Sequence, residues 1–282
     1  MRICEDLDSL HEVNRVWRSS GCSIALVPTM GNLHDGHMQL VRTAREIADR
    51  VVVSVFVNPM QFGKAEDFGS YPRTLDEDCT KLKSEAVDAL FMPGSSLVYP
   101  DGVENSTIVE VPQLSDTLCG KHRPTHFRGV TTVVNKLLNF VRPDFAVFGE
   151  KDFQQLQIIK RMVKDLAMPV RVVSVSTMRE PSGLAMSSRN QYLSAEQREQ
   201  ANVLYLTLTQ IAEQVYMGQH NFQKLEENAI KRLENAGFTV DYVSICNPST
   251  LLPAEQTDTK LSVLGAAWLG KTRLIDNIQV HL

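Results

Sequence analysis

The strongest constraint on the fold is a regular alternation of short apolar runs with longer amphipathic stretches through the first two thirds of the chain. The apolar runs are rich in β-branched residues, as strands are, whereas the stretches between them repeat apolar residues at helical spacing. The run at residues 51–57 is apolar almost throughout, which is typical of parallel strands that helices cover on both faces. The alternation therefore predicts an α/β fold with a Rossmann-like, doubly wound parallel sheet.

The predicted elements divide the chain into two units. We expect strands at residues 23–28, 51–57, 88–93, 144–149 and 170–175. We expect helices at residues 37–48, 76–85, 131–140 and 152–166. Two long helical patterns at 194–216 and 222–236 then precede antiparallel strands at 239–245 and 261–282. We therefore expect one domain over residues 1–178 and a smaller C-terminal α+β domain over residues 179–282, with a linker at 179–183.

Composition excludes several classes of protein. The chain has 29 Lys+Arg against 33 Asp+Glu, and a net charge of −4 provides no basic field to hold a nucleic acid. No run approaches the roughly 18 apolar residues of a membrane helix, and the first residues lack the build of a signal peptide, so we expect a cytoplasmic protein with no membrane partner. The five cysteines form no CxxC pair, and we expect reduced thiols.

Residues 265–272 match the pattern G-x-x-x-x-G-K-[ST] of a nucleotide P-loop. That mechanism needs a helix after the loop, with its N-terminus facing the phosphates. The residues after Thr272 instead contain an Asp276-Asn277 pair between β-branched runs, which predicts a hairpin that turns at this pair. We interpret the match as a coincidence.

Two histidines lie in the loop after the first predicted strand. In a doubly wound sheet, ligands bind beyond the carboxyl ends of the strands, and the N-terminus of the following helix favours an anion. His34 and His37 stand three residues apart around Gly36, so both rings should project to one side. The alternatives are a pair of structural histidines or a metal-binding pair, although zinc would lack an obvious third ligand.

Two further strand ends carry polar residues. Lys151 can place a point charge against phosphate, and the amides of Gln154 or Gln155 can reach a small ligand. The alternative is that Asp152 caps the helix and Lys151 is solvated. At the end of the apolar strand, Gln61 stands between apolar neighbours, which suits a ligand with a hydrocarbon body and hydroxyl or carboxylate groups.

The H-x-G-H segment resembles the signature of the nucleotidyltransferase superfamily, which includes the class I aminoacyl-tRNA synthetases. Residues 186–190, with two serines and an arginine, occupy the place of that superfamily's second signature. Over nearly the whole chain, the order and spacing of motifs are similar to those of the pantothenate synthetase family. The similarity lies in residues 28–37, 56–62, 71–74, 126–130, 148–155, 186–193, 266–270 and 273–277.

This resemblance implies a ligase that condenses (R)-pantoate with β-alanine and converts ATP to AMP and diphosphate through a pantoyl adenylate. The implied ATP site consists of Met30, Gly31, Asn32, Leu33, His34, Asp35, Gly36, His37, Gly149, Glu150, Lys151, Asp152, Met178, Met186, Ser187, Ser188 and Arg189. Gln61 and Gln155 are implied to bind pantoate, and Gln61 also β-alanine. Apolar neighbours such as Phe62 and Val130 would pack on the gem-dimethyl group of pantoate.

The implied catalytic residues are His37, His34, Lys151 and Arg189. The resemblance assigns His37 as proton donor and His34 as a phosphate contact. Lys151 and Arg189, with Ser187 and Ser188, would neutralise charge as pyrophosphate leaves. Because phosphoryl transfer depends mostly on positioning and charge stabilisation, His37 is equally open to a role as a hydrogen-bond donor to phosphate.

Other expectations concern the metal, the assembly and a loop. Mg²⁺ should arrive with ATP, and we name no protein ligand for it, because a solvated helix N-terminus explains Asp76, Glu77 and Asp78 equally well. The family resemblance implies a homodimer formed through the N-terminal domain. Residues 62–70 are polar and contain glycine, and we predict that they are mobile without substrate and close over the adenylate.

Two rival functions remain open at the level of sequence. Another H-x-G-H nucleotidyltransferase that keeps AMP on its product would share His34 and His37. A nucleotide-sensing or scaffold protein would have no need of groups directed at a departing pyrophosphate. The acidic charge balance and the lack of an extra RNA-binding domain disfavour tRNA charging.

Overall fold

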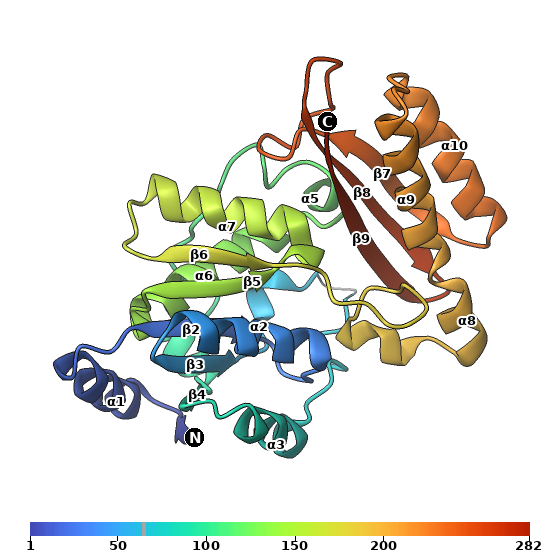
Figure 1. Ribbon diagram of the computed structural model, residues 1–282. Helices are drawn as coiled ribbons and strands as arrows, with labels where there is room; N and C mark the ends of the chain where they lie inside the picture. Colours follow the sequence, from blue (N-terminus) through green and yellow to red (C-terminus); the bar gives the residue numbers. More distant parts are fainter. Residues whose placement is uncertain (64–65) are drawn as a thin grey trace.

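The computed structural model describes residues 1–63 and 66–282. Its elements form two sheets, one parallel and one antiparallel (Figure 1). The parallel sheet has six strands in the order β1-β4-β3-β2-β5-β6, and the antiparallel sheet has three in the order β7-β8-β9. The predicted fold class, a doubly wound α/β sheet with a smaller α+β part, is confirmed. The domain boundary after residue 178 stays a prediction.

Five of the six parallel strands coincide with predicted runs. The strands are β1 (Arg2–Cys4), β2 (Ile24–Thr29), β3 (Arg50–Val55), β4 (Ala89–Phe91), β5 (Phe145–Gly149) and β6 (Arg171–Val175). Strand β1 escaped prediction because three residues are too few to show a period of two. Side chains alternate between the faces of β2, so Leu26 joins one apolar core and Val27 the other.

Helices cover both faces of the parallel sheet. The helices before β6 are α1 (Leu7–Ser19), α2 (Asp35–Ile47), α3 (Leu75–Ser84), α4 (Ser95–Val98), α5 (Cys119–His122), α6 (His126–Val141) and α7 (Phe153–Asp165), with 3-10 turns η1 (Pro59–Gln61) and η2 (Glu150–Asp152). Apolar residues of α1, α6 and α7 pack on one face, and those of α2 and α3 on the other. This two-sided cover explains why residues 51–53 have no exposed surface.

Helix α6 begins five residues before the predicted start at residue 131. Its first turn contains Gly129, a residue that lowers helix propensity and so obscured the start. Glycine is required here by packing, because a Cβ atom at Gly129 would lie 2.6 Å from backbone atoms of Met60 and Gln61. The close approach brings η1, and Gln61 within it, against the helix.

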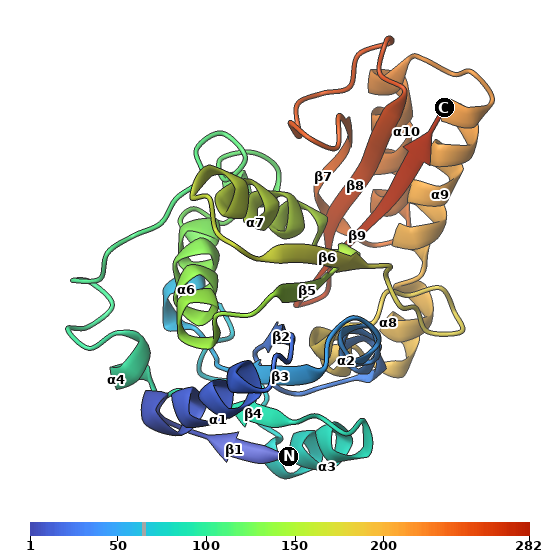
Figure 2. The ribbon, with the colours of Figure 1, turned by 60° about the vertical axis from the view of Figure 1, so that its left-hand side comes forward.

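The C-terminal part contains η3 (Ser188–Tyr192), α8 (Ala195–Gln200), α9 (Val203–Tyr216), α10 (Phe222–Asn235), β7 (Thr239–Cys246), β8 (Lys260–Leu269) and β9 (Thr272–His281). The single helix predicted at residues 194–216 is wrong, because the chain turns at Ala201 and Asn202 between α8 and α9. At this turn the Asn202 side chain donates a hydrogen bond to the Ser182 carbonyl. Figure 2 shows the antiparallel sheet standing beside the β5–β6 side of the parallel sheet.

The predicted turn at Asp276-Asn277 is also wrong. The hairpin turns at Gly270 and Lys271, where Gly270 supplies the positive φ of +59°. Asp276 and Asn277 lie inside β9, opposite Gly265 and Leu264 of β8. The residues that match the P-loop pattern therefore run from one antiparallel strand into the next, and no helix follows them, which confirms that the match is a coincidence.

All five cysteines are free, and three of them are buried. No helix in the part of the chain that the structure describes is long and apolar enough to cross a membrane. The predicted mobile loop at residues 62–70 includes Lys64 and Ala65, which lie outside the described residues, and its mobility stays a prediction.

Candidate active site

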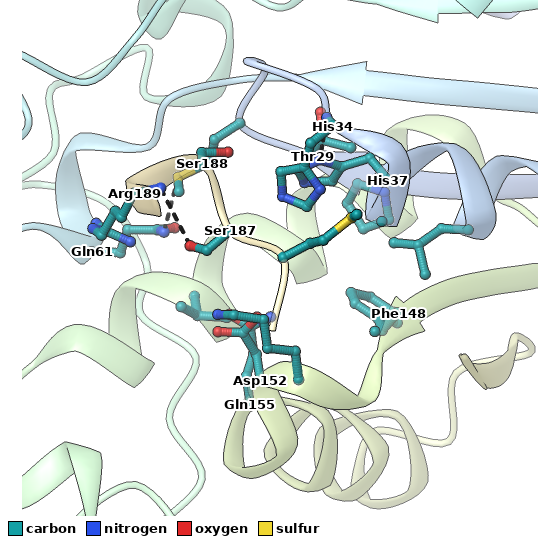
Figure 3. A pocket seen from close by; sticks show the side chains of 18 of the residues that line it. Thr29, His34, His37, Gln61, Phe148, Asp152, Gln155, Ser187, Ser188 and Arg189 are labelled. Atoms are coloured by element: carbon teal, nitrogen blue, oxygen red, sulfur yellow. Dashed lines mark hydrogen bonds and ion pairs between the residues drawn. The ribbon is translucent and has the colours of Figure 1, made fainter. Parts of the chain in front are cut away.

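A cavity of about 250 Å³ opens at the carboxyl ends of β2, β5 and β6 (Figure 3). Predicted site residues that line it are Met30, His34, Gly36, His37, Gln61, Gly149, Lys151, Asp152, Gln155, Met178, Met186, Ser187, Ser188 and Arg189. Gly31, Asn32, Leu33, Asp35 and Glu150 were predicted as well, but they are not part of the lining. The cavity thus brings together segments that are far apart in the sequence, at the edge where ligands of such sheets bind.

His34 and His37 lie at the start of α2 with ring centroids 4.0 Å apart. The backbone N–H of His34 donates to Nδ1 of His37 at 3.2 Å, so a neutral His37 carries its proton on Nε2. Gly36 is required between them, because a Cβ atom there would lie 2.9 Å from the His34 ring. The expectation that both rings project to one side is confirmed.

Both histidines are held neutral. Burial lowers the pKa of His37 well below its ordinary value, and the neighbouring His34 and Lys151 lower it further. Burial and then Lys151 lower the pKa of His34 to about 4. The Nδ1 atom of His34 is buried and has no hydrogen-bond partner among the described residues. The pair can therefore donate and accept hydrogen bonds near pH 7 without carrying charge.

Asp78 of α3 fixes the loop that precedes the histidines. Its carboxylate is 1% exposed and accepts hydrogen bonds from the backbone N–H groups of Asn32 at 2.9 Å and Leu33 at 2.8 Å. Lys81 donates to the Leu33 carbonyl at 2.6 Å. The interpretation of Asp78 as a solvated residue is therefore wrong. Its place one turn before buried Leu82, on the apolar face of α3, was the signal for its burial.

Gln61 is oriented by residues that sequence reasoning missed. Asn58 is buried and donates to Gln61 Oε1 at 3.1 Å and to the Gly129 carbonyl at 3.0 Å. The Tyr99 hydroxyl donates to Asn58 Oδ1 at 2.6 Å. This chain of bonds fixes which end of the Gln61 amide is the oxygen, and its Nε2 lies 3.1 Å from Met30 Sδ.

The two neighbouring glutamines on α7 differ in role. Gln155 lines the cavity. Gln154 is buried, and its amide bonds the backbone of residues 114, 117 and 119 instead. Of the two amides considered from sequence, only that of Gln155 faces the cavity.

Lys151 is mostly buried beside the cavity, with its side chain 19% exposed and Nζ 3.9 Å from Asp152 Oδ2. Asp152 makes no side-chain capping bond to α7. The alternative of a helix cap with a solvated lysine is therefore wrong. Because a buried ammonium needs compensation, this side of the cavity is suited to an anion.

Two arginines of the cavity wall are paired with adjacent acids. Arg189 donates from Nε and Nη2 to the Asp67 carboxylate, at 3.1 and 2.9 Å. Arg123, which sequence reasoning missed, is paired in the same way with Glu66. Each guanidinium has five N–H groups, so each retains donors for a ligand in the cavity.

One wall of the cavity is apolar. It consists of Leu40, Phe56, Val130, Val133, Val134, Leu137 and Phe148. Val130 was predicted here, but Phe62 is not part of the lining and packs against Phe68 and Tyr71. Such a wall suits a hydrocarbon group.

The geometry defines a class of protein before any relative is considered. A parallel sheet presents a helix N-terminus, two neutral histidines and the cations Lys151 and Arg189 to one cavity, beside an apolar wall. This set of groups is typical of enzymes that act on nucleotides or other phosphorylated ligands. The described residues bring together no cluster of three or more metal-ligating side chains.

Comparison with known proteins identifies the family. The Pantoate-beta-alanine ligase family matches residues 2–279. The pantothenate synthetase of Methylococcus capsulatus is 54% identical over 282 residues, covering 100% of this chain and 99% of its own length. That of Idiomarina loihiensis is 55% identical over 274 residues and covers 97% of each chain. The chain belongs to the pantoate-beta-alanine ligase family.

Solved structures agree with this assignment. The pantothenate synthetase of Thermus thermophilus superposes with a TM-score of 0.93 at 42% identity, covering 100% of both chains. The pantoate-beta-alanine ligase of Francisella tularensis, solved in complex with β-γ ATP and β-alanine, superposes with a TM-score of 0.77 at 34% identity, covering 99% of this chain and 97% of its own.

Proposed function

We propose that this chain, an ATP-dependent ligase of pantoate and β-alanine, carries out the reaction in the cavity at the ends of β2, β5 and β6 through a pantoyl adenylate. The observation that carries the proposal is the pair of neutral histidines facing the same cavity as the mostly buried Lys151. The complex of the Francisella tularensis relative with β-γ ATP and β-alanine supports ATP and β-alanine as ligands.

In the first step, a carboxylate oxygen of pantoate attacks the α-phosphorus of ATP, and the bond from that phosphorus to pyrophosphate breaks. Nε2 of His37 donates a hydrogen bond to phosphate, since the neutral ring has its proton there. Lys151 and Arg189 offset the charge that builds on the departing pyrophosphate. On this account His37 acts as a hydrogen-bond donor and has no proton to give as an acid.

In the second step, the β-alanine amine attacks the acyl carbon, the bond to the AMP oxygen breaks, and the amine loses a proton. Gln61 and Gln155 orient pantoate through their amides, and Gln61 also contacts β-alanine. The gem-dimethyl group of pantoate packs on the apolar wall that includes Val130. Exclusion of water by this wall protects the adenylate from hydrolysis.

The remaining ATP contacts come from the loops at residues 149–152 and 178–189. Met178 contacts the adenine side, Met186 contacts the rest of the nucleotide, and Ser187 and Ser188 offer hydroxyls to the phosphates. All four residues line the cavity. Mg²⁺ enters with ATP, because it binds phosphate oxygens readily and retains much of its water. We propose no protein ligand for it.

The rival function is a nucleotidyltransferase that keeps AMP on its product. Pantoate labelled with ¹⁸O in its carboxylate separates the two. On our account one labelled oxygen is found in released AMP, because that oxygen joins the α-phosphorus and stays there when the amine attacks. Label in orthophosphate, or a product that retains AMP, would contradict the proposed mechanism.

Two further properties follow from the resemblance and are proposed on that basis. We expect a homodimer through the N-terminal domain, which light scattering of the purified protein would test. We also expect a cytoplasmic enzyme, and cell fractionation would test that expectation.

A further inference from the structure

Asp276 and Asn277, the two residues wrongly expected to form a turn, connect the antiparallel sheet to the cavity. Both are almost fully buried in β9, at 5% and 6% exposure. Because successive side chains of a strand point in different directions, the two residues reach different loops. Each loop contributes residues to the cavity wall.

Asn277 holds the loop that carries Lys151. Its Nδ2 donates hydrogen bonds to the backbone carbonyls of Glu150 at 2.8 Å and Lys151 at 3.0 Å. Its Oδ1 accepts from Gln279 Nε2 at 3.0 Å, and Gln279 in turn accepts from the Ser262 hydroxyl. The amide is thus oriented by the antiparallel sheet, and both of its donors are directed at the backbone beneath Lys151.

Asp276 holds the loop that carries Met178 and Met186. Its carboxylate accepts two hydrogen bonds from Arg179, at 2.6 and 2.9 Å. The Arg179 guanidinium also lies 3.8 Å from the centre of the Tyr205 ring. Met178 and Met186 are joined by a backbone hydrogen bond of 2.9 Å next to this ion pair. A nearly buried carboxylate requires such pairing, so the loop cannot move freely away from β9.

We propose that Asp276 and Asn277 are positioning residues for adenylation, which hold the Met178 and Lys151 loops at the cavity from the second sheet. The proposal rests on the function proposed above and adds residues that make no contact with substrate. A shift of the Lys151 loop by about 1 Å would be enough to slow the step substantially. The antiparallel sheet thereby contributes to catalysis without supplying a reacting group.

The test is the rate of pantoyl adenylate formation in a single turnover without β-alanine. Asn277→Ala removes both donors, and we expect slowing on the order of 10- to 100-fold. Asn277→Ser, which keeps a short donor, should fall between this variant and the parent chain. Asn228→Ala, at an exposed position of α10 in the same part of the chain, is the matched control and should be unchanged.

A double-mutant cycle with Lys151→Met separates positioning from general loss of structure. If Asn277 acts through Lys151, Asn277→Ala slows adenylation far less in the Lys151→Met background than in the parent. If Asn277→Ala slows adenylation by the same factor in the Lys151→Met background as in the parent, the proposal is overturned. Thermal unfolding of each variant shows whether it is folded. If Asn277→Ala is not folded, Asn277→Ser takes its place in the cycle. If Lys151→Met leaves the rate of adenylation unchanged, the function proposed for Lys151 is refuted. That single variant is measured first, so this failure is distinguishable from a failure of the proposal for Asn277.

Asp276→Asn gives an independent test, because it weakens the ion pair but keeps one acceptor. We expect it to weaken ATP binding, with a smaller effect on the rate constant at saturating ATP, since the loop that Asp276 holds carries Met178, the residue proposed for the adenine side. Asn277→Ala should instead lower the rate constant at saturating ATP, with a smaller effect on ATP binding. The same proportional change of both parameters in both variants would contradict separate positioning roles.

Discussion

The two sides of the cavity are anchored in different parts of the molecule. The histidine side, residues 28–37, is held by Asp78 and Lys81, which belong to a helix on the parallel sheet. The side with Lys151 and Met178 is held by Asn277 and Asp276 of the antiparallel sheet. The difference teaches that groups facing one cavity can be held by elements of two different sheets. Changes to the two sets of anchors should therefore have different consequences.

Removal of the Lys151 charge should have the largest effect. Lys151→Met keeps most of the apolar stem but offers nothing to the departing pyrophosphate, and we expect adenylation to slow about 100- to 1000-fold. Rapid-quench measurement of the adenylate would show this. Lys160→Met, at an exposed position of α7, is the control. A loss of less than tenfold would remove Lys151 from the proposed mechanism.

On the histidine side, Asp78→Ala should destabilise the fold as well as slow the reaction. It leaves the buried N–H group of Leu33 and the partly buried N–H group of Asn32 without acceptors, which costs about 3 kcal/mol of unfolding free energy. Asp78→Asn keeps one acceptor oxygen and should lose less. Urea denaturation of both variants measures the difference. Equal stability of Asp78→Ala and the parent chain would show that the loop does not need this anchor.

Stability should decrease on acidification. Burial lowers the folded-state pKa of His34 and of His126 to about 4, below the ordinary value of about 6.5 that applies to the unfolded chain. As the pH falls from about 6.5 to 4, the unfolded chain binds protons that the folded chain does not, so the unfolding free energy falls. His34→Gln should make this dependence shallower. Exposed His220→Gln is the control, and identical pH profiles for His34→Gln and the parent would contradict the assignment.

The smallest effect is expected at the P-loop match in the antiparallel sheet. Lys271 is exposed in the turn between β8 and β9 and does not line the cavity. Lys271→Ala should leave the KM for ATP unchanged. A marked increase in that KM would mean that this part of the chain binds ATP directly, and the distinction between the two sides of the cavity would fail.

Local patterns predicted most of the parallel sheet and the shared orientation of the two histidines. Period and β-branched content identified β2 to β6, and the spacing of His34 and His37 around Gly36 indicated that the rings face one way. These features depend on residues close together in the chain. Helix boundaries were less accurate where packing decided them, as at Gly129, whose role depends on the approach of Met60 and Gln61.

Local sequence patterns could not predict that Asn277 and Asp276 hold the loops of the cavity. Asn277 bonds a carbonyl 126 residues earlier in the chain, and Asp276 pairs with an arginine 97 residues away. In sequence, an Asp-Asn pair between β-branched runs is typical of a turn, and only the register of β8 and β9 places it within a strand. The burial of Asp78 could have been predicted, because its position on the apolar face of α3 was visible in the sequence.

The most direct test of the central claim is the exchange of labelled pyrophosphate into ATP, measured with and without pantoate and in the absence of β-alanine. Reversible formation of pantoyl adenylate predicts exchange that requires pantoate and is lost in Lys151→Met. Absence of pantoate-dependent exchange in folded protein would contradict adenylation of pantoate at this cavity.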